Sequence, residues 1–211
     1  MDIKLFKEFK TAKLFNEKGL QIDLASARRE FYPAGGALPI VDLGHLQADM
    51  FRRDFTINAL ALSLHPDTFG ELLDFYRGLN DLHDGKIKVF HPQSFIDDPT
   101  RILRAIRFEQ RFDFDLEEAT ESYLKEAIKK KAYRTVKAPR YFTEFQRILL
   151  EEDPLKPLKR LQRLGLLVLA NHKLSFNTRS FTRFRTSFKK LKRKSYLRDY
   201  PRSWILYVGL L

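Results

Sequence analysis

The segment 97–108, DDPTRILRAIRF, constrains the fold of this chain more than any other stretch of its sequence. Asp98 and Pro99 form a typical helix start, because a carboxylate can cap the first turn and proline fits the first helical position. At 100° per residue, one arc of this helix carries only apolar side chains: Ile102, Leu103, Ala105 and Ile106. The opposite arc carries three arginines: Arg101, Arg104 and Arg107. The segment therefore predicts an amphipathic helix with its apolar face in a core.

The arginine stripe has two interpretations. Like charges along one helical face repel one another unless an anion lies across them, and guanidinium groups match phosphate oxygens in bidentate geometry. A triphosphate or an RNA backbone is therefore one ligand. Asp98 and Arg101 also present an acceptor beside a donor, the combination that reads base edges. The alternative is structural: Asp98 caps the helix, and Arg101 and Arg104 pair with nearby acids.

A second segment of mixed charge lies at 51–61, FRRDFTINALA. Arg53 can hold a phosphate or sugar oxygen, and Asp54 can accept a hydrogen bond from a ribose hydroxyl, which favours ribonucleotides. Apolar residues at helical spacing between 57 and 64 predict a helix that carries Asn58. The alternative is that Asp54 only caps this helix while Arg52 and Arg53 face solvent.

The rest of the chain divides near residue 90. Short strands are predicted before it, at 12–15, 20–24, 72–76 and 86–90, with a Pro- and Gly-containing loop at 33–39. Helices are predicted after residue 98, at 117–130, 139–151 and 154–164. Arg140 and Glu144 stand four residues apart on one of these helices, so they could form an ion pair. An α+β piece followed by an all-helical piece is expected.

The chain is strongly basic, with a net charge of +12 and a pI near 9.8. Such a balance favours a polyanionic partner or, alternatively, is only a cationic surface. Residues 171–200 hold ten Lys or Arg against one Asp, and carry Phe181, Phe184 and Phe188 at helical spacing. These aromatics either stack on single-stranded RNA or form a core face behind solvated charges. There is no cysteine and no apolar run long enough to span a bilayer, so we expect a cytoplasmic protein without a membrane partner.

Taken together, segments 51–61 and 97–108 resemble the nucleotide-binding half of the class II tRNA nucleotidyltransferases (CCA-adding and A-adding) and the bacterial poly(A) polymerases. The resemblance covers residue 8 to about residue 170. It implies a partial nucleotidyltransferase head of the polymerase-β-like type in residues 1–92. A neck would follow in residues 93–170, and the start of a basic helical body in residues 171–211.

The resemblance also implies roles for particular residues. An amino-acid template that pairs with the incoming base matches five positions: Asp97, Asp98, Arg101, Arg104 and Arg107. The sugar and phosphate would be bound by three: Arg53, Asp54 and Asn58. The Asp-Asp-Pro-Thr-Arg form resembles branches that include A-adding enzymes, although members that add C carry it too. The implied partners are ATP, CTP or both, and the 3′ end of tRNA or another RNA.

The implied reaction transfers a nucleotide to an RNA 3′ end and uses Mg²⁺ held by an Asp-x-Asp on a strand. The single Asp-x-Asp here, Asp113 to Asp115, occupies a turn position in the family pattern, so we reject it. Asp23 matches a third acidic position of the family or is an ordinary edge-strand residue. We therefore expect no metal ligands in this chain, weak nucleotide binding and no catalysis by it alone. A complementary chain that supplies the Asp-x-Asp is one expected partner. The alternative is a non-catalytic RNA-binding module.

Overall fold

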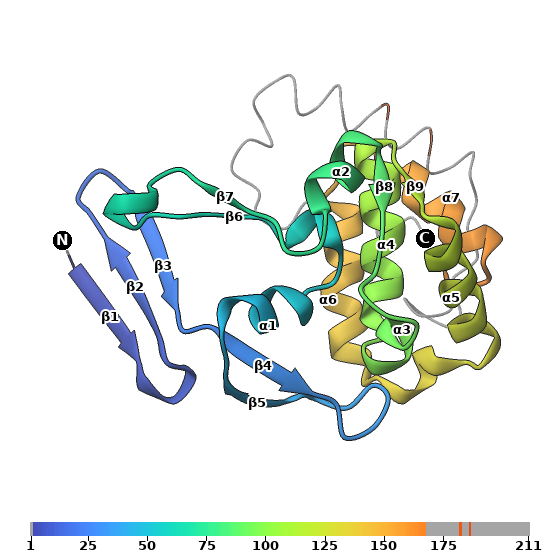
Figure 1. Ribbon diagram of the computed structural model, residues 1–211. Helices are drawn as coiled ribbons and strands as arrows, with labels where there is room; N and C mark the ends of the chain where they lie inside the picture. Colours follow the sequence, from blue (N-terminus) through green and yellow to red (C-terminus); the bar gives the residue numbers. More distant parts are fainter. Residues whose placement is uncertain (1, 168–181, 183–185, 187–211) are drawn as a thin grey trace.

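The computed structural model describes residues 2–167 and the single positions 182 and 186. Strands dominate the first part of this range and helices the second, which confirms the expected α+β fold. Figure 1 shows the first strands at one side of the molecule and the long helices at the other. The candidate site lies where the segments between these two groups meet the helices.

Two small antiparallel sheets form the N-terminal part. The first contains three strands in chain order: β1 (Asp2–Phe6), β2 (Thr11–Phe15) and β3 (Gln21–Ala25). The second pairs β4 (Arg28–Phe31) with β5 (Ile40–Leu43) around the predicted loop at 33–39. A 3-10 turn, η1 (Lys7–Phe9), links β1 to β2. The strands predicted at 12–15 and 20–24 are therefore confirmed.

The leucine and isoleucine side chains of the first sheet share one face. The register aligns Ile3, Leu14 and Ile22 in one row and places Leu5, Ala12 and Leu24 in another. Ile3 is 64% exposed and Leu5 63% exposed, so this face is open within the described part of the chain. Among the described residues, the buried hydrophobic side chains begin only at Met50. The strands before it contribute no side chain to the core.

The segment after Asp54 contradicts the predicted helix at 57–64. After α1 (Leu46–Phe51) the chain forms a single 3-10 turn, η2 (Thr56–Asn58), and then a hairpin. This hairpin pairs β6 (Ala61–Leu62) with β7 (Leu72–Leu73) around another 3-10 turn, η3 (Pro66–Thr68). The hydrogen bonds Ser63 N to Glu71 O and Gly70 N to Ser63 O extend the pairing. Long-range pairing thus overrides the local apolar spacing.

The helical part is built around one central helix. It contains six α-helices within the described residues: α2 (Gly78–His83), α3 (Ser94–Asp97), α4 (Thr100–Phe112), α5 (Glu118–Lys129), α6 (Ala138–Leu149) and α7 (Leu155–Arg163). A short parallel pair, β8 (Lys86–Ile87) with β9 (Asp115–Leu116), and the 3-10 turn η4 (Ala132–Thr135) complete it. Figure 1 shows α4 in the middle of this group, and α4 packs against α6 and α7. The strands predicted at 72–76 and 86–90 are only two residues long.

The apolar face of α4 forms the centre of the core. Ile102, Leu103 and Ile106 are at most 1% exposed and pack in one cluster with Phe145 and Leu158. This confirms the amphipathic helix predicted at 97–108. The same cluster also includes residues that precede α4, among them Phe55 and Ile87, so the predicted head and neck share one core.

The division into 1–92, 93–170 and 171–211 stays a prediction. Apart from positions 182 and 186, the basic segment at 171–200 lies outside the described residues, and so do Phe181, Phe184 and Phe188. In the described part of the chain, every helix is too short or too polar to cross a bilayer.

Gly78 tests the packing that holds the 3-10 turn η2. A Cβ at Gly78 would lie 2.2 Å from the Thr56 carbonyl oxygen, so Gly78→Ala forces the backbones of α2 and η2 apart. We expect a loss of about 3 kcal/mol in the free energy of unfolding, measured by urea denaturation. The matched control is Gly70→Ala, where φ is +84° but the space is open, and we expect about 1 kcal/mol. Equal losses would contradict the close contact.

Candidate functional site

An open pocket of about 760 Å³ lies between α4, α6, the 52–58 segment and the end of β4. Six of the residues predicted from the sequence line it: Arg53, Asp54, Asn58, Asp98, Arg101 and Arg104. Five further charged or phenolic side chains line it as well: Glu30, Tyr32, Arg52, Arg140 and Glu144. Residues from 30 to 144 thus meet at one cavity. Asp23, Asp97 and Arg107 are not among its lining residues.

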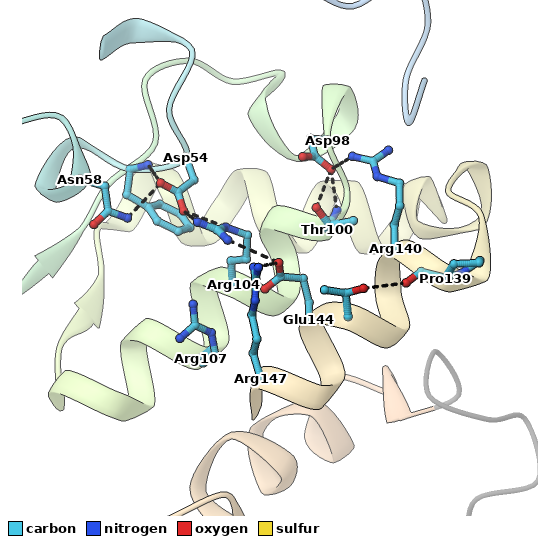
Figure 2. Close-up of polar contacts among 12 residues, drawn as sticks. Asp54, Asn58, Asp98, Thr100, Arg104, Arg107, Pro139, Arg140, Glu144 and Arg147 are labelled. Carbon is cyan, nitrogen blue, oxygen red and sulfur yellow. Dashed lines mark hydrogen bonds and ion pairs between the residues drawn. The ribbon is translucent and has the colours of Figure 1, made fainter. Parts of the chain in front are cut away.

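Asp54 is the most constrained acid of the pocket. It is 9% exposed, and its Oδ1 accepts hydrogen bonds from Phe55 N at 3.0 Å and Asn58 Nδ2 at 2.9 Å. Its Oδ2 accepts from Arg104 Nε at 2.8 Å and also from Arg104 Nη2. Figure 2 shows this arrangement, with Asn58 on one side of the carboxylate and Arg104 on the other. Asn58 therefore orients Asp54.

Arg104 is shared between two carboxylates. Its Nη1 donates to Glu144 Oε1 on α6 at 3.4 Å, while Nε and Nη2 bind Asp54. Burial lowers the pKa of the Arg104 guanidinium, but the charges and hydrogen bonds of Asp54 and Glu144 together outweigh burial and raise it. Arg104 is thus permanently charged and held by acids from two other segments.

Arg101 has a different environment. Its side chain is buried, with the residue 5% exposed, and Nη2 donates to the Arg52 carbonyl oxygen at 2.8 Å. Nη1 is also buried, and it has no hydrogen-bond partner among the described residues. A buried donor without a partner is costly, so a ligand acceptor in the pocket would relieve this cost. Arg101 therefore offers one donor to the cavity.

Asp98 is fixed through one of its oxygens. Oδ1 accepts from Thr100 N at 3.1 Å, from Thr100 Oγ1 at 2.7 Å and from Arg140 Nη2 at 2.9 Å. Asp98 thus caps the first turn of α4, as the structural interpretation expected, and also lines the pocket. All three hydrogen bonds from the described residues go to Oδ1, so Oδ2 is the oxygen left for another donor.

The expected ion pair between Arg140 and Glu144 is wrong. Arg140 binds Asp98 and donates through Nη1 to the Gly36 carbonyl oxygen at 3.1 Å, whereas Glu144 binds Arg104 and Arg147. Figure 2 shows the two side chains with different partners: Arg140 points to Asp98, and Glu144 points to Arg104 and Arg147. Gly36 N also donates to the Asp97 carbonyl oxygen at 3.0 Å, so the 33–39 loop is bound to the end of α3, just before α4.

Arg107 is separated from the other two arginines of the stripe. Its Nη1 donates to Glu151 Oε1 at 2.9 Å, and its guanidinium lies 4.3 Å from the centre of the Phe108 ring. It lines a second cavity of about 750 Å³ between α4, α6 and α7. The stripe therefore needs no single anion across it, because Glu151 compensates Arg107 and two acids compensate Arg104.

Asp97 and Asp23 also lie outside the pocket. Asp97 Oδ2 is 4.0 Å from His91 Nδ1, and burial lowers the pKa of that histidine. Asp23 lies on β3 with its side chain 61% exposed, and it pairs with Lys13 on β2 at 3.4 Å. This geometry agrees with the ordinary-strand interpretation of Asp23.

The acids of the described chain do not form a metal site. Among residues 2–167, no group of three or more His, Cys, Asp or Glu is arranged to hold an ion. Asp113 Oδ1 accepts from Lys156, and Asp115 Oδ2 accepts from Lys86, so both belong to exposed ion pairs. The Mg²⁺ that the resemblance implies therefore does not fit the residues at hand.

The sequence analysis assigned no site role to the other eight lining residues: Glu30, Tyr32, Arg52, Thr100, Phe108, Arg140, Thr143 and Glu144. The Glu30 side chain is 7% exposed and pairs with Arg28 and Arg52, and Tyr32 donates to it at 3.3 Å. Burial raises the pKa of the Tyr32 phenol. The only signal for them in the sequence was the spacing of Arg140 and Glu144, which stand four residues apart on one predicted helix.

Comparison with known proteins gives three findings. A sequence profile described as the Poly A polymerase head domain matches residues 2–88. The A-adding tRNA nucleotidyltransferase of Geobacter sulfurreducens is 42% identical over 165 residues, which cover 78% of this chain and 19% of that protein. The A-adding tRNA nucleotidyltransferase of Halalkalibacterium halodurans is 38% identical over 164 residues, which cover 77% of this chain and 38% of the relative.

Solved structures are also similar. A tRNA nucleotidyltransferase crystallised with a primer tRNA and an incoming ATP analog superposes with a TM-score of 0.76 at 31% identity. The match covers 100% of this chain and 59% of that one. The chain thus spans well under two thirds of the length of these relatives.

Asp49 gives a pH-dependent test of how the pocket arginines are held. Burial raises its pKa, but hydrogen bonds from Arg52, Arg28 N and Arg53 outweigh burial, so the net pKa is lowered. A lowered folded-state pKa stabilises the fold above the ordinary value of about 4, and this stability is lost as the pH falls through the folded-state value. Asp49→Asn removes this titration, so its melting temperature should fall less steeply below about pH 4.

Asp42→Asn is the matched control, because Asp42 forms an exposed pair with Arg29 in which both side chains are more than 65% exposed. Its melting profile should follow the unsubstituted protein. An Asp49→Asn profile as steep as that of the unsubstituted chain would contradict the assignment.

Proposed function

The chain belongs to the family of tRNA nucleotidyltransferases and bacterial poly(A) polymerases, and on this premise we propose that it selects the ribonucleotide and binds RNA for nucleotide addition at an RNA 3′ end. The reaction class is transfer of a nucleotidyl group from a nucleoside triphosphate to a 3′ hydroxyl, with release of pyrophosphate. One observation carries the proposal: Asp54, Asp98 and Arg101 line a single pocket, and Arg101 Nη1 is buried without a hydrogen-bond partner among the described residues.

Base selection rests on Asp98 and Arg101 at the start of α4. Arg101 Nη1 can donate to a ring nitrogen or carbonyl, and Asp98 Oδ2 can accept from an exocyclic amine. Adenine and cytosine both present an amine beside an acceptor, so ATP and CTP both suit this pair. Because Arg140 and Thr100 hold Asp98, and the Arg52 carbonyl holds Arg101, both groups are fixed before a base arrives.

Sugar selection rests on Asp54. The carboxylate accepts a ribose hydroxyl, and Asn58 keeps it oriented through Oδ1. Arg53 is the most exposed cation of this segment, at 41% of its side chain, with Asp49 and the Asn58 carbonyl as partners. It is therefore the cation best placed to reach a phosphate outside the pocket.

The transfer step needs metal ligands that the described residues do not supply. In nucleotidyl transfer of the kind that this family carries out, Mg²⁺ stabilises the attacking and leaving oxygens. We propose that an Asp-x-Asp on another stretch of polypeptide provides the Mg²⁺ ligands. A complementary chain is one source of that Asp-x-Asp. The tRNA 3′ end is the acceptor that the relatives' names favour. Asp97 and Arg107 would then support the template from outside the pocket.

A non-catalytic RNA-binding module is the second candidate, because the described acids form no metal site. The two candidates differ in whether the missing carboxylates can be added. We expect that mixing this chain with a head fragment of a relative that carries Asp-x-Asp, in the presence of Mg²⁺, yields incorporation of labelled ATP or CTP into tRNA. The matched control is the same fragment with both aspartates changed to asparagine. No incorporation above that control would favour the binding module.

Arg101→Ala separates base selection from RNA binding. The substitution removes the unpartnered donor, so we expect loss of preference among nucleoside triphosphates and about tenfold weaker ATP binding. Affinity for tRNA should change less than twofold, since Arg101 is buried. Fluorescence anisotropy with labelled ATP and labelled tRNA measures both. An equal loss for both ligands would count against the template role.

A further inference from the structure

Both carboxylate oxygens of Asp54 are fully used as hydrogen-bond acceptors in the arrangement described above. Each of its two oxygens accepts two hydrogen bonds: Phe55 N and Asn58 Nδ2 share Oδ1, and Arg104 Nε and Nη2 share Oδ2. A carboxylate has about four lone-pair sites, and all four are used. A ribose hydroxyl can therefore bind Asp54 only if one of these donors leaves.

Arg104 is the donor that can leave. Phe55 N belongs to the backbone, and Asn58 is bound to the same short turn as Asp54, whereas Arg104 comes from another helix on a long side chain. The Arg104 side chain is only 26% exposed, and a largely buried charge that loses its acid is costly unless another acid replaces it. The exchange is possible only if a second acid stands within reach.

Glu144 is that acid. It lies on α6, is 7% exposed, and its Oε1 already accepts from Arg104 Nη1 at 3.4 Å, a long contact. Its Oε2 is buried and has no hydrogen-bond partner among the described residues. Figure 2 shows Arg104 between Asp54 and Glu144, and Arg147 donates to the same Glu144 oxygen, Oε1. Because its contact with Arg104 is long and its Oε2 has no partner among the described residues, Glu144 can accept further hydrogen bonds from the Arg104 guanidinium.

We propose that Glu144 is a positioning residue for ribonucleotide selection: it receives the Arg104 guanidinium when a ribose hydroxyl takes over Asp54 Oδ2. The inference rests on the proposed function, because it assumes that Asp54 reads the sugar. Arg104 then keeps a charged partner in both arrangements, so the exchange costs little. Without Glu144, a ribose hydroxyl that binds Asp54 would leave the largely buried Arg104 guanidinium without an acid.

Glu144→Gln tests this through the sugar. The variant keeps the shape of the side chain but removes its charge, so Arg104 should remain on Asp54. We expect ATP to bind the unsubstituted chain about tenfold more tightly than 2′,3′-dideoxy-ATP, which has no hydroxyl for Asp54. In Glu144→Gln that ratio should fall to about twofold, through weaker ATP binding with dideoxy-ATP binding unchanged. Titration calorimetry measures both nucleotides.

Glu109→Gln is the matched control. Glu109 is a similarly buried acid on α4, with its side chain 12% exposed, and it pairs with Arg160 away from the pocket. It should leave the ratio at about ten. Equal loss of both nucleotides in Glu144→Gln, or an unchanged ratio, would overturn the proposal and leave Glu144 as a purely structural residue. If the unsubstituted chain binds neither nucleotide, the proposed function itself fails.

A second measurement needs no nucleotide. In Asp54→Asn the charge of Asp54 is gone, so Arg104 should turn to Glu144, and Glu144→Gln should then cost more than in the unsubstituted chain. We expect the melting temperature to fall by about 2–4 °C more in the Asp54→Asn background. Adding Glu109→Gln to Asp54→Asn should be additive. Additive effects for Glu144→Gln as well would overturn the exchange, whatever the nucleotides do.

Discussion

The ion pairs of Arg104 join three parts of the chain that would otherwise be independent. Arg104 lies on α4, Asp54 precedes it by fifty positions, and Glu144 follows it by forty on α6. Because these charges are largely removed from water, each must be matched by another, and losing one partner costs more than the pair contributes. The pocket therefore keeps its shape through a balance of charge. This balance also brings the segment around Asp54 into contact with α4.

The helix α4 can carry this pocket because its opposite face is rigid. Ile102, Leu103 and Ile106 are essentially fully buried and pack against α6 and α7. Close packing on one side fixes the axis and rotation of the helix, so Arg101 and Arg104 project from set positions on the other. The same reason explains why Arg107 is separated from them: one further turn along α4 brings it to Glu151 and a second cavity.

The helix α6 supplies two of the side chains that hold the pocket together. Arg140 connects Asp98 with the 33–39 loop, and Glu144 receives Arg104 one turn later. Two positions one turn apart on this helix thus hold Asp98 directly and Asp54 through Arg104. A local rule for residues four apart predicted that Arg140 and Glu144 would bind each other, but the stronger, buried partners lie on other elements. Positions that orient a site are found only when the packing of the elements is known.

Periodicity and composition by themselves determined that strands dominate before residue 90 and helices after it, and that α4 is amphipathic. Two motifs, through the family that they resemble, also identified six residues of the pocket. These features are local, because they depend on spacing along one element and on the preferences of Asp, Pro and Gly at its ends. The tertiary structure decided the rest. It replaced the helix expected after Ile57 with a hairpin, since pairing with Leu72 and Leu73 outweighs the apolar spacing. It also selected the partner of each charged side chain, because burial makes a charge choose the acid or base that packing brings nearest, at whatever distance in sequence.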